Sequence, residues 1–136
     1  MIGLIITGHG EFASGMMSAI KLLSGIPEEC VAVDFTQQDT TDDLEFRLKD
    51  IIEGMNSCEG ILVLTDLYGG SPFNEAIELS HELQDHQDIR VVSGVNLGMI
   101  LQADRARGYV NNVDVLADLA IDEGKKQTFK YIDEEN

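Results

Sequence analysis

Four short apolar runs recur along the chain, and each has the length and the β-branched content of a strand buried on both faces. The runs are "IGLII" at 2–6, "CVAVDF" at 30–35, "GILVLTD" at 60–66 and "IRVVSG" at 89–94. Strands that are apolar throughout are typical of parallel sheets covered on both sides. The pattern therefore predicts four parallel strands.

Segments with helical spacing follow these runs. Apolar residues recur every three or four positions at 12–23, 41–55 and 72–83 between the strands, and at about 97–107 and 113–124 after the fourth strand. Regular alternation of strands and helices is typical of a doubly wound α/β sheet with helices on both faces. We expect a sheet in the order 2-1-3-4.

The end of the chain departs from this alternation. In the segment "QTFKYI" at 127–132, Phe129 and Tyr131 lie on one side and Lys130 on the other. Such a segment predicts an edge strand or an arm exchanged with another chain. The acidic residues 133–136 are expected to be disordered, which leaves 1–132 as a single domain.

Composition narrows the function classes. A chain of 136 residues with 43% hydrophobic composition can bury one core. Its formal charge of −16 repels nucleic acid and anionic lipid and favours basic protein partners or small substrates. The first apolar run lacks a basic leader, and no run approaches the roughly 18 apolar residues of a membrane span. We expect a cytoplasmic protein that neither binds nucleic acid nor inserts into a membrane.

Cysteine and histidine spacing gives no indication of a metal site. Cys30 and Cys58 stand outside any CxxC pattern, so we expect two small buried hydrophobic residues in a reducing compartment. His81 and His86 lie among polar residues and are expected to face solvent, because no further Cys or His stands at ligand spacing.

Two arginines stand near the end of the helix predicted at 97–107. A positive charge at this end of a helix interacts favourably with the helix dipole. We therefore expect Arg105 and Arg107 to be solvated or paired with the dipole, and a phosphate-clamping role for either stays open.

The strongest candidate for chemistry is a histidine–aspartate pair. In an open α/β sheet, ligands bind beyond the carboxyl ends of the strands where the strand order reverses, here between the first and third strands. His9 follows the first strand and Asp66 ends the third, and neighbouring strands are about 4.8 Å apart. Asp66 would accept the Nδ1 proton of His9 and leave Nε2 as a nucleophile. A purely structural histidine is the alternative.

The loop after the third strand, "DLYGGSPFN" at 66–74, is suited to holding an anion. Gly69 and Gly70 permit backbone conformations closed to other residues, and Ser71 suits an N-cap. Exposed amides at the start of the next helix, with the Ser71 hydroxyl, would stabilise the oxygens of a phosphoryl group. A well-capped turn without chemistry is the alternative.

Two other glycine motifs overlap the turn after the first strand. "GHGEFA" at 8–13 fits G-x-G-x-x-[GA], and Asp34 ends the next strand where a ribose-binding acid would stand, so a nucleotide- or dinucleotide-binding or regulatory module is the alternative function. "GEFASG" at 10–15 opens like a P-loop. However, Met16 and Met17 stand where Lys and Ser or Thr are required, which excludes that motif.

Three of these segments together resemble the mannose-type enzyme IIA domain of the bacterial phosphotransferase system (PTS). They are "GHG" after the first strand, "LTDLYGGSPFN" at 64–74 and "VVSGVNLGM" at 91–99, and the likeness runs over nearly the whole chain. The resemblance implies a flavodoxin-like fold with a last strand, antiparallel to its neighbours, that is exchanged across a homodimer. It also implies a phosphotransferase that needs no metal and no cofactor.

The resemblance assigns roles to residues. It implies that His9 accepts a phosphoryl group from the phosphocarrier HPr and passes it to enzyme IIB, with Asp66 as the partner of the histidine. Ser71 takes the place of the phosphoryl-binding serine of the glycine loop. The adjoining glycines Gly10, Gly69 and Gly70 complete the expected phosphoryl-binding site.

Two departures from the family pattern concern the sugar rather than the phosphorylation chemistry. Gly8 stands where many members carry Thr or Ser, and Tyr68 stands where mannose members often carry Trp. The sequences of the motifs most closely resemble those of members that serve amino sugars such as N-acetylgalactosamine or galactosamine. Because the chain stops at Asn136, we expect enzyme IIB to be a separate polypeptide that leads to the membrane IIC/IID transporter.

Overall fold

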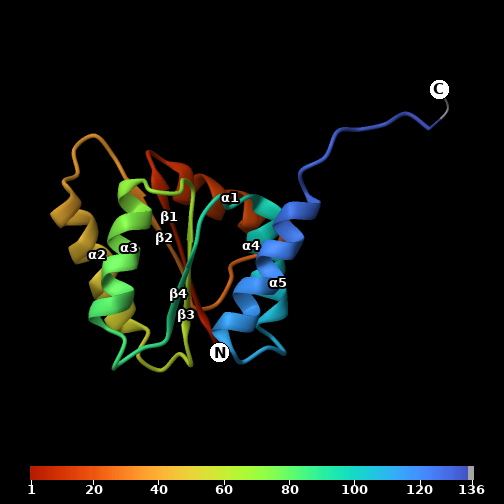
Figure 1. Ribbon diagram of the computed structural model, residues 1–136. Helices are drawn as coiled ribbons and strands as arrows, with labels where there is room; N and C mark the ends of the chain where they lie inside the picture. Colours follow the sequence, from red (N-terminus) through yellow and green to blue (C-terminus); the bar gives the residue numbers. More distant parts are fainter. Residues whose placement is uncertain (135–136) are drawn as a thin grey trace.

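A parallel β-sheet with helices on both faces forms the body of the protein (Figure 1). The computed structural model describes residues 1–134. In this range the strands are β1 (Gly3–His9), β2 (Cys30–Phe35), β3 (Ile61–Thr65) and β4 (Ile89–Val92). Their order is β2-β1-β3-β4, and the three neighbouring pairs are all parallel. The predicted sheet and its order are confirmed.

The helices divide between the two faces of the sheet. They are α1 (Phe12–Ser24), α2 (Thr41–Gly54), α3 (Ser71–Glu82), α4 (Leu97–Ala106) and α5 (Val113–Lys126). Helices α2 and α3 cover one face, and α1, α4 and α5 cover the other (Figure 1). Along β1, Leu4 and Ile6 pack under the second group of helices, whereas Ile5 packs under the first. This burial on both faces explains why the central strands β1 and β3 are almost entirely apolar.

Side-chain caps fix where several helices begin. Thr40 and Asp43 form a reciprocal capping box at the start of α2, with bonds of 3.1 Å and 2.9 Å. The side chains of Asn96 and Asn112 accept hydrogen bonds from backbone amides in the first turns of α4 and α5. The helices accordingly lie where the apolar spacing predicts them. Within residues 1–134, no helix is both long and apolar enough to cross a lipid bilayer.

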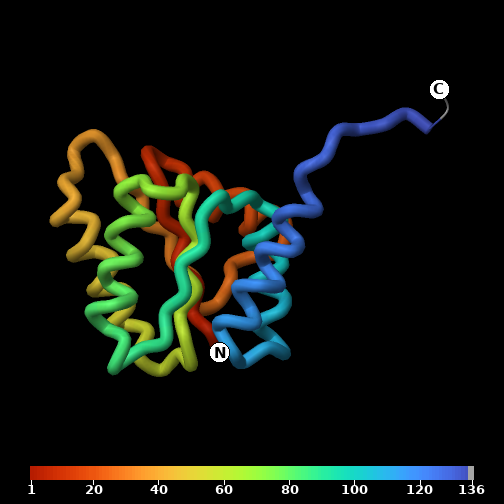
Figure 2. Tube along the Cα trace, viewed as in Figure 1, coloured from red at the N-terminus to blue at the C-terminus, as the bar shows by residue number. Residues whose placement is uncertain are grey.

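The segment after α5 leaves the body of the molecule as an extended arm (Figure 2). Phe129 and Tyr131 on this arm are 77% and 79% exposed. Residues 128–134 form no strand in the single chain, so exchange of this segment with a second chain stays a prediction. The domain limits at 1–132 and the disorder of 133–136 also stay predictions, and 135–136 lie outside the described residues.

One expectation about the arginines is wrong. Arg107 is buried, with 3% of its surface exposed, and its guanidinium donates hydrogen bonds to the carbonyls of Ile2, Glu28 and Glu29. Asp104 pairs with it at 2.7 Å. Since Ile2 immediately precedes β1, this cluster lies at the amino ends of the strands and contributes nothing at the carboxyl ends. Arg107 is therefore a structural clamp, whereas Arg105 is exposed as expected.

Candidate functional site

The structure brings His9 and Asp66 together at the carboxyl ends of β1 and β3. Nδ1 of His9 lies 2.9 Å from Oδ2 of Asp66, and the backbone amide of His9 donates to the same oxygen at 2.9 Å. The His9 side chain is 45% exposed, but that of Asp66 is only 16% exposed. A shielded carboxylate thus holds an accessible imidazole.

This arrangement selects one tautomer of the imidazole. A carboxylate is an acceptor, so the proton between the two groups stays on Nδ1 and the lone pair of Nε2 remains available for reaction. The second carboxylate oxygen, Oδ1 of Asp66, is buried and has no hydrogen-bond partner among residues 1–134. Both hydrogen bonds that the Asp66 carboxylate accepts among these residues therefore come from His9.

Two glycines are required by close packing around this pair. A Cβ atom at Gly70 would lie 2.5 Å from Cε1 and 3.2 Å from Nε2 of His9. At Gly8, a Cβ atom would lie 2.6 Å from the Phe12 ring and 2.9 Å from Cγ of Asp66. Gly8 therefore makes room for the carboxylate of Asp66 and for the Phe12 ring of α1.

The loop between Asp66 and α3 presents backbone amides beside the imidazole. Gly70, not Ser71 as the sequence suggested, is the N-cap residue, because α3 already begins at Ser71 and no side chain caps it. The Ser71 hydroxyl is thereby left out of the cap, and the first-turn amides of Ser71 and Phe73 have no acceptor within the helix. Asn74 braces the loop by donating to the Gly69 carbonyl at 3.0 Å.

The remaining predicted residue, Gly10, follows His9 directly in a left-handed backbone conformation with φ of +58°. Its amide donates to the carbonyl of Phe35 at 2.7 Å and ties the turn after β1 to the end of β2. The Phe35 ring in turn lies against the imidazole of His9, with ring centroids 6.2 Å apart and an angle of 73° between the planes. No motif marks Phe35; only the β1–β2 register, which pairs His9 with Phe35, places it here.

Comparison with known proteins decides the family. The sequence model of the family described as "PTS system fructose IIA component" matches residues 3–121. The chain belongs to this family.

Individual relatives agree with this assignment. The chain is 29% identical over 125 residues to the PTS system mannose-specific EIIAB component of Escherichia coli, an alignment that covers 92% of this chain but 38% of the relative. It thus spans about two fifths of the length of that relative. With the PTS system fructose-specific EIIA component of Bacillus subtilis it shares 26% identity, over 88% of this chain and 80% of the relative.

Two solved structures resemble this member of the IIA family closely. The phosphotransferase system component EIIA from Streptococcus agalactiae superposes with a TM-score of 0.89 at 35% identity, over 96% of this chain and 97% of that one. For the mannose/sorbose-specific IIA subunit from Enterococcus faecalis the TM-score is 0.82 at 28% identity, with 96% and 94% covered.

The geometry of this IIA-family chain disfavours the dinucleotide alternative. The carboxylate of Asp34 accepts hydrogen bonds from the backbone amide and the hydroxyl of Ser14 at 2.9 Å and 2.6 Å. In a dinucleotide-binding fold, the pyrophosphate occupies the N-terminus of this helix. Here a fixed negative charge already lies in the first turn of α1, and it would repel a second anion.

The thiols of the IIA-family chain lie away from this site. Cys58 is buried as expected, whereas Cys30 is partly exposed. Burial raises the pKa of the Cys30 thiol to about 11, so it stays protonated at neutral pH. His81 and His86 are exposed, as their polar surroundings predict. No three His, Cys, Asp or Glu side chains gather into a metal-binding group within the described part of the chain.

Proposed function

We propose that the chain is the enzyme IIA component of a sugar phosphotransferase system, working in the cytoplasm. In this proposal Nε2 of His9 accepts a phosphoryl group from phospho-HPr and delivers it to enzyme IIB, which serves the membrane IIC/IID transporter. The observation that carries the proposal is the exposed imidazole whose Nδ1 is held by Asp66 while Nε2 remains available. Membership of the IIA family supports it independently.

The transfer needs alignment more than covalent assistance. Nε2 of His9 attacks phosphorus in line, the new N–P bond forms, and the N–P bond to the histidine of HPr breaks. The proton on Nδ1 stays in place, and the carboxylate of Asp66 stabilises the positive charge that the imidazole acquires. Because donor and acceptor are both histidines, the exchange is nearly balanced.

The phosphoryl oxygens are received by the loop before α3. The Ser71 and Phe73 amides carry the partial positive charge of a helix N-terminus, and the Ser71 hydroxyl adds a further donor. Gly69 and Gly70 keep this surface free of side chains, and the missing Cβ of Gly70 lets the loop approach Nε2 of His9. Gly10 sets the turn on the other side of the imidazole.

Phosphorylation in a reconstituted system tests this function. Incubation with phosphoenolpyruvate, enzyme I and HPr should add one phosphoryl group, detected by mass spectrometry under alkaline conditions that preserve phosphohistidine. The His9→Ala variant should take up none, whereas His86→Ala, which alters an exposed histidine outside the site, should behave as the wild type. Phosphorylation of the His9→Ala variant at the wild-type rate would refute the assignment.

For the sugar, the proposal is an amino sugar such as N-acetylgalactosamine or galactosamine. The support is the resemblance of the "TGHGEFASG" and "LTDLYGG" segments to members of that class. Loss of uptake of these sugars, with mannose and fructose uptake unchanged, is the expected result of deleting the gene. Loss of mannose or fructose uptake instead would exclude the amino-sugar assignment.

A homodimer is also part of the proposal. Strand β4 is an edge of the described sheet, and beside it lies a cleft of about 470 Å³. Its lining includes Val91, Gly94, Ile121 and Thr128, the last of which begins the extended arm. An edge strand next to an apolar cleft is suited to accept an extended segment. The segment 128–132 of a second copy, with Phe129 and Tyr131, is the proposed occupant, antiparallel to β4.

A further inference from the structure

We propose that Phe35 is a positioning residue for the phosphoryl transfer, acting by holding the imidazole ring of His9 in the orientation that directs Nε2 toward the donor. The inference rests on the function proposed above. It follows from the contact between the two rings, whose centroids lie 6.2 Å apart at an interplanar angle of 73°.

The bond to Asp66 cannot fix the imidazole by itself. One hydrogen bond of 2.9 Å restrains the distance between Nδ1 and Oδ2 of Asp66, but the angles at both atoms keep some range, so the ring can still turn about its side-chain torsions. The χ2 torsion of histidine is broad, so it does not select an orientation. Further contacts are needed to determine where Nε2 points.

Those contacts come from residues at or just after the carboxyl ends of the two strands beside β1. Strands β2 and β3 flank β1 on opposite sides. Phe35 ends β2, and Gly70 lies in the loop that follows β3, where its backbone closely approaches Cε1 and Nε2 of His9. The imidazole is thus bounded by the Gly70 backbone from the β3 side and by an aromatic ring from the β2 side.

Contacts hold both the backbone and the side chain of Phe35 in place. Its carbonyl accepts the amide of Gly10 at 2.7 Å, and its side chain packs against the cluster that contains Val33 and Leu44. A positioning group must be more rigid than the group that it positions. These two contacts make Phe35 rigid at the end of β2.

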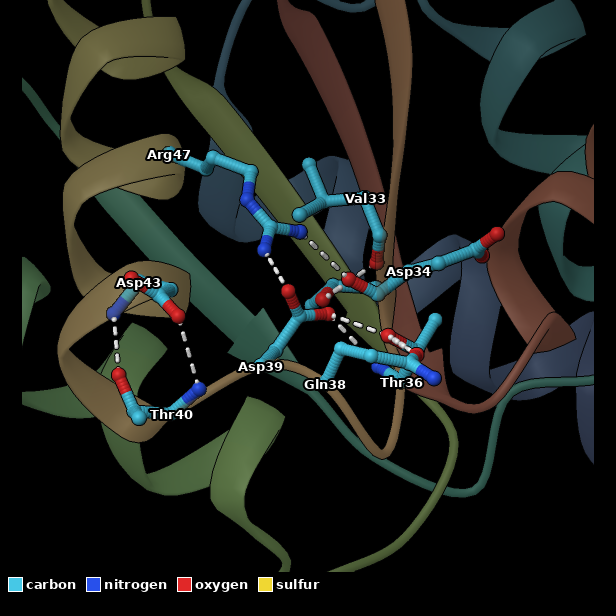
Figure 3. Close-up of polar contacts among 9 residues, drawn as sticks. Val33, Asp34, Thr36, Gln38, Asp39, Thr40, Asp43 and Arg47 are labelled. Carbon is cyan, nitrogen blue, oxygen red and sulfur yellow. Dashed lines mark hydrogen bonds and ion pairs between the residues drawn. The ribbon is translucent and has the colours of Figure 1, made fainter.

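The loop that follows Phe35 is locked by a polar network (Figure 3). Arg47 donates to the Asp34 carbonyl at 3.1 Å and pairs with Asp39. Asp39 accepts the amide and the hydroxyl of Thr36 at 2.8 Å and 3.0 Å. The hydrogen bond from the Thr36 amide contributes most to holding the pKa of the Asp39 carboxyl below its ordinary value, and the bond from Arg47 lowers this pKa further. The residues before and after Phe35 are therefore both fixed to α2 or to its preceding loop.

Replacing the ring should slow transfer without weakening donor binding. Phe35→Leu keeps an apolar side chain packed against the core but removes the aromatic ring that meets the imidazole at an interplanar angle of 73°. A displacement of about 1 Å at a reacting atom costs roughly 100-fold in rate, and partial loosening costs less. We expect the maximal single-turnover rate from phospho-HPr to fall about tenfold, with the half-saturating donor concentration unchanged, and Phe35→Tyr to restore the rate.

The matched control is Phe46→Leu, the same substitution at a residue of α2 that is 73% exposed. It should transfer at the wild-type rate. A Phe35→Leu variant that transfers at the wild-type rate would overturn the inference, whatever its melting temperature. If the wild type itself is not phosphorylated on His9, the proposed function fails, and the following measurement still tests Phe35.

Nuclear magnetic resonance (NMR) relaxation of the histidine rings tests the positioning directly and needs no phosphoryl donor. In the wild type, the His9 ring should be as rigid as the backbone, whereas the exposed His86 ring should be mobile on the nanosecond timescale. In Phe35→Leu the His9 ring should become mobile while its Nδ1 proton is retained. A mobile His9 ring in the wild type would refute the proposal, irrespective of how well the variant folds.

Discussion

At the residue scale, the site depends on an accessible imidazole held by a shielded carboxylate. Both hydrogen bonds that the Asp66 carboxylate accepts within residues 1–134 come from His9, one from the backbone amide and one from Nδ1. The surrounding positions must stay small because His9 and Asp66 lie so close to the backbone. Gly70 is the clearest case. Its φ of −74° and ψ of 167° are accessible to any residue, so only the lack of space beside His9 requires a glycine there.

Gly70→Ala therefore isolates a steric effect. The new Cβ would lie 2.5 Å from Cε1 of His9, so the imidazole or the loop must move. We expect phosphorylation from phospho-HPr to slow by about 10- to 100-fold, with the circular dichroism spectrum unchanged. Gly15→Ala, in an open position on α1, is the control and should transfer at the wild-type rate. An unimpaired Gly70→Ala variant would show that the close approach has no role.

At the scale of the elements, side-chain caps fix where α2, α4 and α5 begin, whereas no side chain caps α1 or α3, the helices that follow His9 and Asp66. The capping box of Thr40 and Asp43 starts α2 immediately after the network that fixes the end of β2. Each side chain of the box satisfies one backbone amide that the helix leaves without an acceptor.

Thr40→Ala should remove half of this box. Loss of an N-cap hydroxyl costs about 1 kcal/mol, so the free energy of unfolding measured with urea should fall by about that amount. Thr41→Ala, one residue later and already within the helix, should change it by less than about 0.5 kcal/mol. Equal effects of the two substitutions would mean that the hydroxyl of Thr40 does not cap α2.

The sequence predicts these elements well because strands buried on both faces and amphipathic helices leave strong local patterns. It also places His9 and Asp66 together, since both follow strands that neighbour one another at the switch point. Serine favours the N-cap position, so the sequence predicts Ser71 as the cap of α3, but the helix already begins at Ser71 and Gly70 is its N-cap.

Contacts made across the sheet are harder to predict. The role of Phe35 depends on its register with His9, and no spacing within its own strand reveals it. Arg107 resembles a solvated residue at a helix end, yet three backbone carbonyls from distant segments surround it. Such contacts become visible only when the chain is folded.

At the scale of the whole molecule, the arm at 128–132 pairs with no strand among residues 1–134. Its large side chains, Phe129, Tyr131 and Ile132, are 75% to 79% exposed. Exposed apolar residues of this kind favour association with another surface. In the proposed homodimer, the edge strand β4 and its adjacent cleft on a second copy would provide such a surface.

Truncation tests this exchange. The full chain should be a dimer at micromolar concentration by light scattering coupled to size-exclusion chromatography. Removal of residues 128–136 should produce a monomer, whereas removal of 133–136 alone, which leaves the apolar arm intact, should preserve the dimer. A dimer of unchanged affinity without residues 128–136 would exclude exchange of the arm as the basis of association.

NMR of the phosphorylated, ¹⁵N-labelled protein measures which nitrogen of His9 reacts. Coupling between ³¹P and the imidazole nitrogens identifies the atom that carries the phosphoryl group. Because Asp66 holds the proton on Nδ1, we expect coupling to Nε2 of His9. Coupling to Nδ1 of His9, or to any other residue, would contradict it.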